Sequence, residues 1–455
     1  MKKKLTYRFL FAFFILCLIL LQLTSYGQKA DPKLVEKYGL VIPPDPGDKL
    51  EPAPEWIQKA DMFGGGRYID HKFFLKDTVM TRIVRIRAGN GPLQITEHYP
   101  VETVGGLEVE KGALLLSHVP HARRSFEEAH KQGVKAIPYL HFTDIHSFYA
   151  DQDVFMFEHP EVLLKDEKAK WMHIPMDGSD RAFRFLTCAN SPYYWKSSLA
   201  YVKKMMDWGA DGIFIDNVGN RQPCFADKHN VRNPEFLPFV HEHLFPDADH
   251  NYAWDKLLQA IRILVKSYGD DKIVLLNSGI GTQFQKNGDA CMWESFIYSW
   301  AWEGRRHTWD DVKKRAKENE WFLNTGRRID ALSTINRSGK TAKDDAFWAF
   351  SAARLVDFIW AGGLNGTGAE VLYETKMGKG LEPFKEINKV AYRVYENGLI
   401  VLNDSDKDQT IEIVLPAISK AKQVKDLFNN NQIISVRSKK IKVTVPKKCA
   451  RVYHI

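Results

Sequence analysis

Apolar residues in this chain gather in short runs that alternate with longer stretches of helical spacing. Ile213, Phe214 and Ile215 form one such run, apolar on both faces of an extended segment, as in a parallel strand covered on both sides. Before it, Ser191 and Pro192 make a good N-cap and first-turn pair for a helix. The same rhythm predicts strands at residues 113–119, 135–142, 273–277, 290–294, 331–335 and 358–361, and helices that include 125–132, 310–319 and 345–356.

This rhythm predicts an α/β fold built around a barrel. Seven strands can be counted from residue 113, so one more upstream, within residues 81–87, would close a barrel of eight parallel strands. An open doubly wound sheet is the competing architecture, but no glycine-rich phosphate loop follows any of these strands. We therefore predict a (β/α)8 TIM barrel over residues 61–384.

The pattern changes near residue 385 to short strands separated by turns. This change predicts a small C-terminal antiparallel β-domain, sandwich-like, over residues 385–455. Few acidic residues stand at the ends of its strands, so packing against the barrel is favoured over catalysis. Its strands are predicted at residues 398–402, 410–415, 432–436 and 441–445.

The N-terminus has the composition of a secretion signal. A basic start at residues 2–8 precedes an apolar run at residues 9–21, and small residues follow. We predict that residues 1–27 are a cleaved signal peptide and that the mature protein is secreted or periplasmic. A retained anchor is the alternative, although the run is shorter than the roughly 20 residues of a membrane span. Residues 28–60, rich in proline, are predicted to form an extended lead-in rather than packed elements.

The charge of the chain argues against some partners. Its formal net charge is +8, and removing the signal takes away four basic residues and no acid, which leaves +4. This balance is too mild to indicate nucleic acid. After cleavage we expect no stable membrane span.

The cysteines and histidines show no recognised metal-ligand spacing. His241 and His243 are two residues apart with His250 nearby, and no ligand set surrounds them in the sequence. We therefore predict no metal and no cofactor. A disulfide between Cys188 and Cys224 is left open, because an oxidising compartment would permit it.

Two carboxylates stand where predicted strands end. Asp216 follows the run Ile213 to Ile215, and Glu294 follows residues 290–293. In a parallel barrel the active site lies at the carboxyl ends of the strands, so both acids can point into one pocket from strands two positions apart. Such a pair suits glycosidic bond cleavage, with Asp216 as nucleophile and Glu294 as acid/base. Asp211 opens its strand in an Asp-Gly turn, so we interpret it as structural.

Polar and aromatic residues follow the same strand ends. A pocket for a polyhydroxylated ligand needs many donors and acceptors, and aromatic rings can stack on sugar faces. The spacing of the rings is equally typical of one packed face of a strand. The candidate substrate-binding residues are His141, Asp144, Asn217, Asn277, Trp293, Trp300, Trp302 and Asn336.

The motifs Cys188-Ala189-Asn190-Ser191-Pro192-Tyr193, Gly209 to Asn217, Asn277-Ser278-Gly279 and Trp293-Glu294-Ser295 together resemble a known group of enzymes. Over residues 110–455 the chain resembles (β/α)8 glycoside hydrolases related to endo-α-1,4-polygalactosaminidase and, more distantly, the α-galactosidase group. The resemblance implies a glycosidase with Asp216 as nucleophile or stabiliser and Glu294 as proton donor. An insertion at residues 218–252 departs from the pattern and leaves the sugar open.

Two other classes of protein remain open at this point. A carbohydrate-binding barrel without catalysis would keep the rings but hold its two carboxylates too far apart to cooperate. A barrel lyase or aldolase would need a buried lysine at a strand end, which the pattern does not offer. A carboxylate separation of about 5 Å would indicate a retaining glycosidase, and one of about 6.5 to 9.5 Å an inverting one.

Overall fold

The computed structural model describes a folded chain with the barrel at its centre. Among the described residues, no helix is both long enough and apolar enough to cross a membrane. The predicted signal peptide, residues 1–27, lies outside the described residues. These are 29–44, 50–58, 60, 62–64, 82–87, 101–104, 107–110, 126–127, 130, 135–146, 159–168, 170–175, 183–226, 241–246, 248–277, 280–297, 307–333, 335, 341–362, 364, 366–416 and 422–455.

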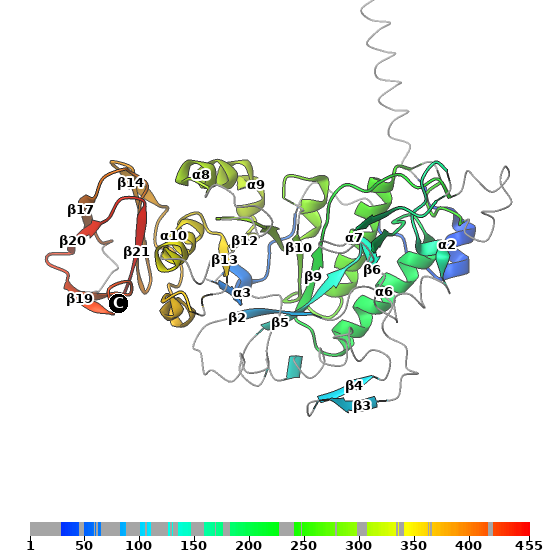
Figure 1. Cartoon of the computed structure of the whole chain (residues 1–455), viewed down its shortest axis with the longest axis horizontal. Helices are drawn as coiled ribbons and strands as arrows, with labels where there is room; N and C mark the ends of the chain where they lie inside the picture. The colour runs from blue at the N-terminus through cyan, green and yellow to red at the C-terminus, as the bar shows by residue number, and fades with distance from the viewer. Residues whose placement is uncertain are drawn as a thin grey trace, which may run out of the picture.

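Eight parallel strands close into a barrel, which confirms the predicted fold class (Figure 1). The order around the barrel is β1-β13-β12-β11-β10-β9-β5-β2, and every neighbouring pair is parallel. The strands are β1 (Met62–Gly64), β2 (Arg82–Arg87), β5 (Lys135–His141), β9 (Gly212–Asp216), β10 (Ile273–Asn277), β11 (Ala290–Trp293), β12 (Arg328–Ser333) and β13 (Ile359–Gly362).

The first barrel strand differs from the prediction. Residues 82–87 form the second strand, β2, and the first is β1 at Met62–Gly64. The predicted strand at 113–119 lies outside the described residues, and the barrel closes without it because β2 pairs directly with β5. The count of eight was right, but one member was assigned wrongly. A strand of three residues is too short to show a periodic signal.

Alternation along the strands decides which side chains fill the barrel. Phe214, Leu275 and Met292 belong to one buried cluster, together with Ile137, Ile273, Ala290, Ile359 and Ala361. The neighbouring residues in the same strands, such as Ile213 in β9 and Val274 in β10, point away from the barrel interior and pack against the helices. Because successive side chains of a strand point to opposite faces, these inward positions fix which later residues reach the barrel mouth.

Three of the helices around the barrel, α6, α7 and α8, begin at side-chain caps. Ser191 accepts a hydrogen bond from Tyr194 N at the start of α6 (Pro192–Asp207), and Asp249 caps α7 (His250–Lys266) from Tyr252 N. Thr308 and Asp311 form a capping box on α8 (Trp309–Glu318), followed by α9 (Glu320–Leu323) and α10 (Ala342–Leu355). The predicted helices at 310–319 and 345–356 correspond to α8 and α10.

The N-terminal lead-in is packed, which corrects the prediction of an extended segment. Asp31 caps α2 (Pro32–Tyr38), which ends at Gly39 in the left-handed conformation and contacts α6. A second short helix, α3 (Glu55–Gln58), buries Ile57 among the residues that fill the barrel. Prolines here start or flank helices, because the first helical turn needs no N–H donor.

Two small antiparallel sheets are separate from the barrel sheet. A hairpin joins β3 (Val101–Val104) to β4 (Leu107–Glu110), and a three-stranded antiparallel sheet has the order β6-β8-β7. The latter consists of β6 (Asp144–His146), β7 (His173–Pro175) and β8 (Phe183–Leu186), and it runs directly into the start of α6. This sheet therefore stands beside the carboxyl end of β5.

The C-terminal residues form antiparallel sheets that pack on α10 (Figure 1). Ala391, Ile400 and Val452 face α10, whereas their neighbours Val390 and Leu399 fill a separate core of the domain. The six-stranded sheet comprises β14 (Lys385–Ile387), β15 (Val390–Tyr395), β16 (Gly398–Asn403), β21 (Cys449–His454), β18 (Gln423–Asp426) and β19 (Gln432–Ser435); a second sheet pairs β17 (Gln409–Val414) with β20 (Lys440–Val445).

Candidate functional site

The two predicted catalytic carboxylates lie at the mouth of the barrel on strands that flank β10. Asp216 ends β9, and Glu294 directly follows β11. Each stands two residues beyond an inward-facing residue, Phe214 and Met292 respectively. Strand parity therefore carries both carboxylates to the inner face, where the hydrophobic filling ends.

Asn277, the last residue of the strand between them, joins the two acids. Its Nδ2 donates to Asp216 Oδ1 at 2.5 Å and to Glu294 Oε2 at 2.9 Å. Both oxygens contact the same nitrogen, so they can lie no farther apart than the sum of the two distances, about 5.4 Å. This bound applies to the nearest oxygens of the two carboxylates, and it agrees with the separation of about 5 to 5.5 Å between the carboxyl groups of retaining glycosidases.

The chain turns in the same way after each acid. Asn217 has φ 55° and Ser295 has φ 68°, both in the left-handed region that residues other than glycine rarely adopt. The turn at Asn217 brings its backbone N–H onto Asp216 Oδ1 at 2.8 Å. Val218 N then donates to Asn277 O at 2.8 Å, which fixes the start of the next loop against β10. Unusual backbone geometry of this kind is concentrated at functional sites.

A cleft of about 260 Å³ opens beside Asp216, and Asp144 and Asn217 line it. Asp144 is buried at the start of β6 and accepts a hydrogen bond from Thr143 Oγ1 at 3.0 Å. The structure therefore brings two of the predicted substrate-binding residues to one cavity. The rest of the lining mixes apolar side chains with polar ones that include Arg184, Asn220, Arg221 and Gln222.

The strand-end segment that carries Asp144 is held by several donors. Arg221 donates to the carbonyls of Phe142 at 3.1 Å and Thr143 at 3.3 Å, and its guanidinium lies 4.1 Å from the centre of the Trp254 ring. The hydroxyl of Tyr194 also donates to Phe142 O, and burial raises the pKa of Tyr194 to about 12, which keeps it a donor. In the sequence Arg221 is only one residue of the insertion at 218–252. Its role in holding this segment could not be predicted, because its partners lie about 80 residues away.

Four other predicted site residues cannot be placed by their side chains. His141 ends β5 and pairs in register with Asp216, so its backbone lies at the mouth, but its side chain is outside the described part of the chain. Trp300, Trp302 and Asn336 also lie outside the described residues.

Trp293, predicted to bind substrate, lies in the hydrophobic core. It precedes Glu294 by one residue and so faces outward, toward α8. Its ring packs 5.1 Å from that of Phe296 and 4.9 Å from that of His307, and the Arg315 guanidinium lies over it at 4.9 Å. This packing against α8 favours a structural role for Trp293 over substrate binding.

Asp211 lies at the opposite end of β9 from Asp216 and serves the fold. Its carboxylate is buried and contacts His130 at 2.7 Å, Lys135 at 3.1 Å and Lys272 at 3.3 Å. Gly212 follows with φ 149°, and a Cβ there would collide with the carbonyl of Ile273 on β10. The Asp-Gly pair thus lets β9 and β10 approach closely, in agreement with its interpretation as structural.

Away from the two acids, the structure gathers residues that the sequence left apart. Cys188, Cys224, His241 and His243 are all buried, and their ligand atoms lie within 4.8 Å of one another. The spacing of these residues in the sequence does not indicate the cluster, because its members come from three separate segments of the chain. Cys188 and Cys224 are free cysteines, so the disulfide left open above is not formed.

Comparisons with known proteins give similarity at the level of fold. No protein-family profile matches the chain, and no curated protein matches it in sequence. The chain is similar to trehalose-6-phosphate hydrolase TreA of Bacillus licheniformis, with TM-score 0.50, 11% identity and coverage of 88% of this chain and 99% of that one. The corresponding values are 0.49, 12%, 87% and 99% for maltogenic α-amylase AmyB of Thermotoga neapolitana, and 0.39, 12%, 67% and 94% for the glycoside hydrolase domain of PelA from Pseudomonas aeruginosa. At such identities the likeness concerns the fold alone.

Proposed function

We propose that this protein is a glycoside hydrolase that cleaves an oligo- or polysaccharide with Asp216 and Glu294. The observation that carries the proposal is the pair of hydrogen bonds from Asn277 Nδ2 to both carboxylates at the barrel mouth. Barrel enzymes place their catalytic residues at this end. Two acids held close together by one amide nitrogen are suited to glycosidic cleavage by a pair of carboxylates.

The surroundings of the two acids support different roles. Asp216 Oδ1 accepts from both Asn217 N and Asn277 Nδ2, and donors of this kind favour an ionised oxygen. Asp216 is therefore the nucleophile that attacks the anomeric carbon. Glu294, which is more exposed and begins a turn directly after β11, protonates the leaving oxygen and then deprotonates the water that releases the sugar. The close approach of the two carboxylates to one nitrogen leads us to propose retention of the anomeric configuration.

The cleft beside Asn217 is the proposed binding site for sugar residues next to the cleaved bond. Asp144, Arg184 and Arg221 supply charged groups along its wall, and aliphatic side chains supply apolar surface. Such a lining suits hydroxyl groups and ring faces together. We propose no nucleic-acid partner and no cofactor for the reaction, and we propose that the mature protein is secreted or periplasmic.

A panel of glycans tests this function. Wild type, Asp216→Asn and Glu294→Gln are incubated with α-glucans, α-galactosides and galactosamine polymers, the latter two because of the sequence resemblance. Released sugars are quantified, and the anomer first formed is read by NMR. Wild type is expected to cleave at least one glycan with retention, and each variant to lose about 1,000-fold or more of kcat, the scale on which loss of one catalytic group acts.

Asp310→Asn is the matched control, because Asp310 is exposed and pairs only at the surface with Lys313 at 2.9 Å. It should cleave like wild type. Cleavage by both acid variants at the wild-type rate would contradict the assignment. Tight glycan binding without any cleavage would instead favour a carbohydrate-binding barrel.

A further inference from the structure

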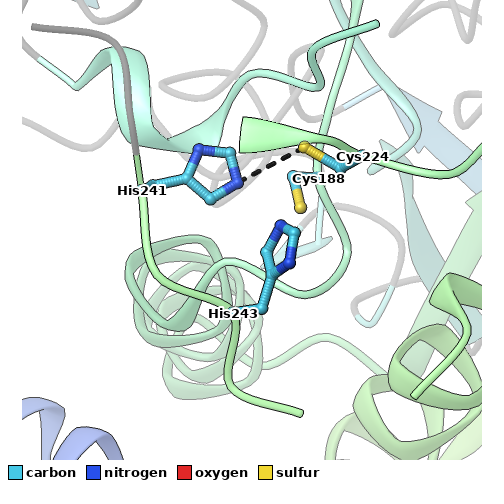
Figure 2. Close-up of side chains that lie close together, drawn as sticks. All are labelled: Cys188, Cys224, His241 and His243. Carbon is cyan, nitrogen blue, oxygen red and sulfur yellow. Dashed lines mark hydrogen bonds between the residues drawn. The ribbon is translucent and has the colours of Figure 1, made fainter. Parts of the chain in front are cut away.

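Side chains from three separate segments of the chain, Cys188, Cys224 and the pair His241 and His243, converge on one point in the protein (Figure 2). Their candidate ligand atoms, two sulfurs and two ring nitrogens, lie within 4.8 Å of one another, and Cys224 Sγ lies 3.6 Å from His241 Nε2. Cys188 is fully buried, and Cys224, His241 and His243 are 4%, 5% and 6% exposed. Burial to this degree is uncommon for two histidines that do not share a partner.

The dimensions of the cluster match one particular ion. Zinc in a structural site binds four ligands tetrahedrally, with Zn–S near 2.3 Å and Zn–N near 2.0 to 2.1 Å. These lengths place a sulfur and a nitrogen roughly 3.6 Å apart along one edge of the tetrahedron, which is the spacing of Cys224 and His241. We propose that Cys188, Cys224, His241 and His243 bind one structural Zn²⁺ ion. The widest pairs need draw in by only about 1 Å.

Local backbone geometry prepares each ligand. His241 and His243 are two residues apart in a segment without helix, so their side chains point to the same side of the chain. Lys165 N donates to Cys224 Sγ at 3.4 Å. Donors of this kind stabilise a thiolate, the form in which cysteine binds a metal. His250 packs edge-on against His243 with ring centres 5.0 Å apart and limits how it can rotate.

The set is closed, so the site is structural rather than catalytic. Four protein ligands complete the coordination of zinc and leave no position for water or substrate. Leu164 and Ala226 pack with the two cysteines in one small apolar cluster, and Met172 and Leu186 cover it. None of the four ligands lines the cleft. A Cys–His nucleophile is disfavoured for the same reason, because neither sulfur faces the cavity.

The position of the ligands explains what the ion would do. Cys188 precedes α6, Cys224 lies in the loop that leaves β9 after Asp216, and His241 and His243 lie on the return of that loop toward α7. A shared ion would tie the insertion at residues 218–252 to the start of α6. Leu164 and Leu186 belong both to this cluster and to the cleft wall. Zinc would thus hold the loop that carries Asn217 and Arg221 against the candidate active site.

The test uses the full mature chain, purified without a histidine tag. Its metal content is measured by mass spectrometry, and the chelated protein is reloaded with Zn²⁺ or with Co²⁺, whose tetrahedral thiolate complexes absorb visible light strongly. We expect about one zinc per chain, a tetrahedral cobalt spectrum, and a melting temperature that falls by about 5 °C or more on chelation. Cys224→Ser and His241→Asn should lose the metal and the spectrum.

Cys449→Ser and His454→Asn are the matched controls, because both residues lie on β21 in the C-terminal domain. Both should keep one zinc. The proposal is overturned if the wild-type chain holds no stoichiometric metal and takes up no cobalt in a tetrahedral site. A Cys188–Cys224 disulfide found by peptide mapping overturns it as well. Wild-type measurements decide the question even if a ligand variant fails to fold, and none of them depends on glycosidase activity.

Discussion

Asp216 and Glu294 accept hydrogen bonds from one and the same nitrogen, Nδ2 of Asn277, at 2.5 and 2.9 Å. The strand order β9-β10-β11 makes this possible, because the middle strand ends in Asn277, whose amide nitrogen carries two hydrogens and can donate to both neighbouring acids. Two ionised carboxylates this close together repel each other, and a donor shared between them offsets part of that repulsion. The sequence predicts Asn277 as a substrate-binding residue, and from its two hydrogen bonds we propose that it positions the two acids.

Replacing Asn277 should damage activity more than stability. Asn277→Ala removes both hydrogen bonds, and we expect kcat on a cleaved glycan to fall about 100-fold or more, as when a preorganised donor is removed. Asn277→Asp should be at least as harmful, since it adds a third carboxylate. Steady-state kinetics and thermal melting measure the two effects separately. Asn397→Ala, in an exposed turn, is the control; equal kcat for it and Asn277→Ala would refute the bridging role.

The left-handed residues after the acids should accept glycine but not β-branched side chains. Asn217→Val and Ser295→Val place a branched residue at φ 55° and 68°, where we expect a cost of about 1–3 kcal/mol each. Asn217→Gly and Ser295→Gly should melt close to wild type, since glycine adopts this region freely. Urea unfolding of the four variants gives the comparison. If valine and glycine behave alike, the turns do not constrain the acids.

Trp293 should matter for folding and not for sugar binding. Trp293→Ala removes a buried ring from the core under α8, for which we expect a loss of about 3–5 kcal/mol. Trp293→Phe keeps most of the packing and should leave KM for a glycan unchanged. Trp321→Ala is the control, because Trp321 is 49% exposed on α9. A large rise in KM for Trp293→Phe with unchanged stability would restore Trp293 as a sugar ligand.

Asp289 should contribute stability that depends on pH. Burial by itself would raise its pKa, but Arg262, at 2.8 and 3.0 Å, and Lys266 outweigh burial and hold the pKa below the ordinary 3.8. A pKa lowered by folding adds stability above the ordinary value, and this stability is lost as the pH falls through the lowered one. Asp289→Asn should lose about 3–5 kcal/mol at pH 7, because it removes the buried charge that pairs with the half-buried Arg262 and Lys266.

Urea unfolding at pH 7 and at pH 3 measures this effect. The difference between wild type and Asp289→Asn should shrink at the lower pH, whereas the exposed Asp310→Asn should follow wild type at both. A difference that is unchanged at pH 3 would mean that the charge of Asp289 is not what stabilises the barrel.

The sequence by itself determined the barrel, the change to β-structure near residue 385 and the position of the two acids. These features depend on local physics: apolar runs define strands, caps define helices, and strand parity carries Asp216 and Glu294 inward from Phe214 and Met292. The same parity turns Trp293 outward. Its position between Met292 and Glu294, both of which point inward, already indicates this in the sequence.

Tertiary structure alone decided the rest. The short strand β1 gains its identity only from pairing with β2 and β13, since three residues carry no period. The bridge from Asn277 to both acids depends on the order of strands around the barrel. The cysteines and histidines meet because the loop after β9 returns to the start of α6, and Cys188 lies far along the chain from His241. Spacing in a sequence reports contacts within a turn or a strand, whereas contacts between distant segments are set by packing of the whole core.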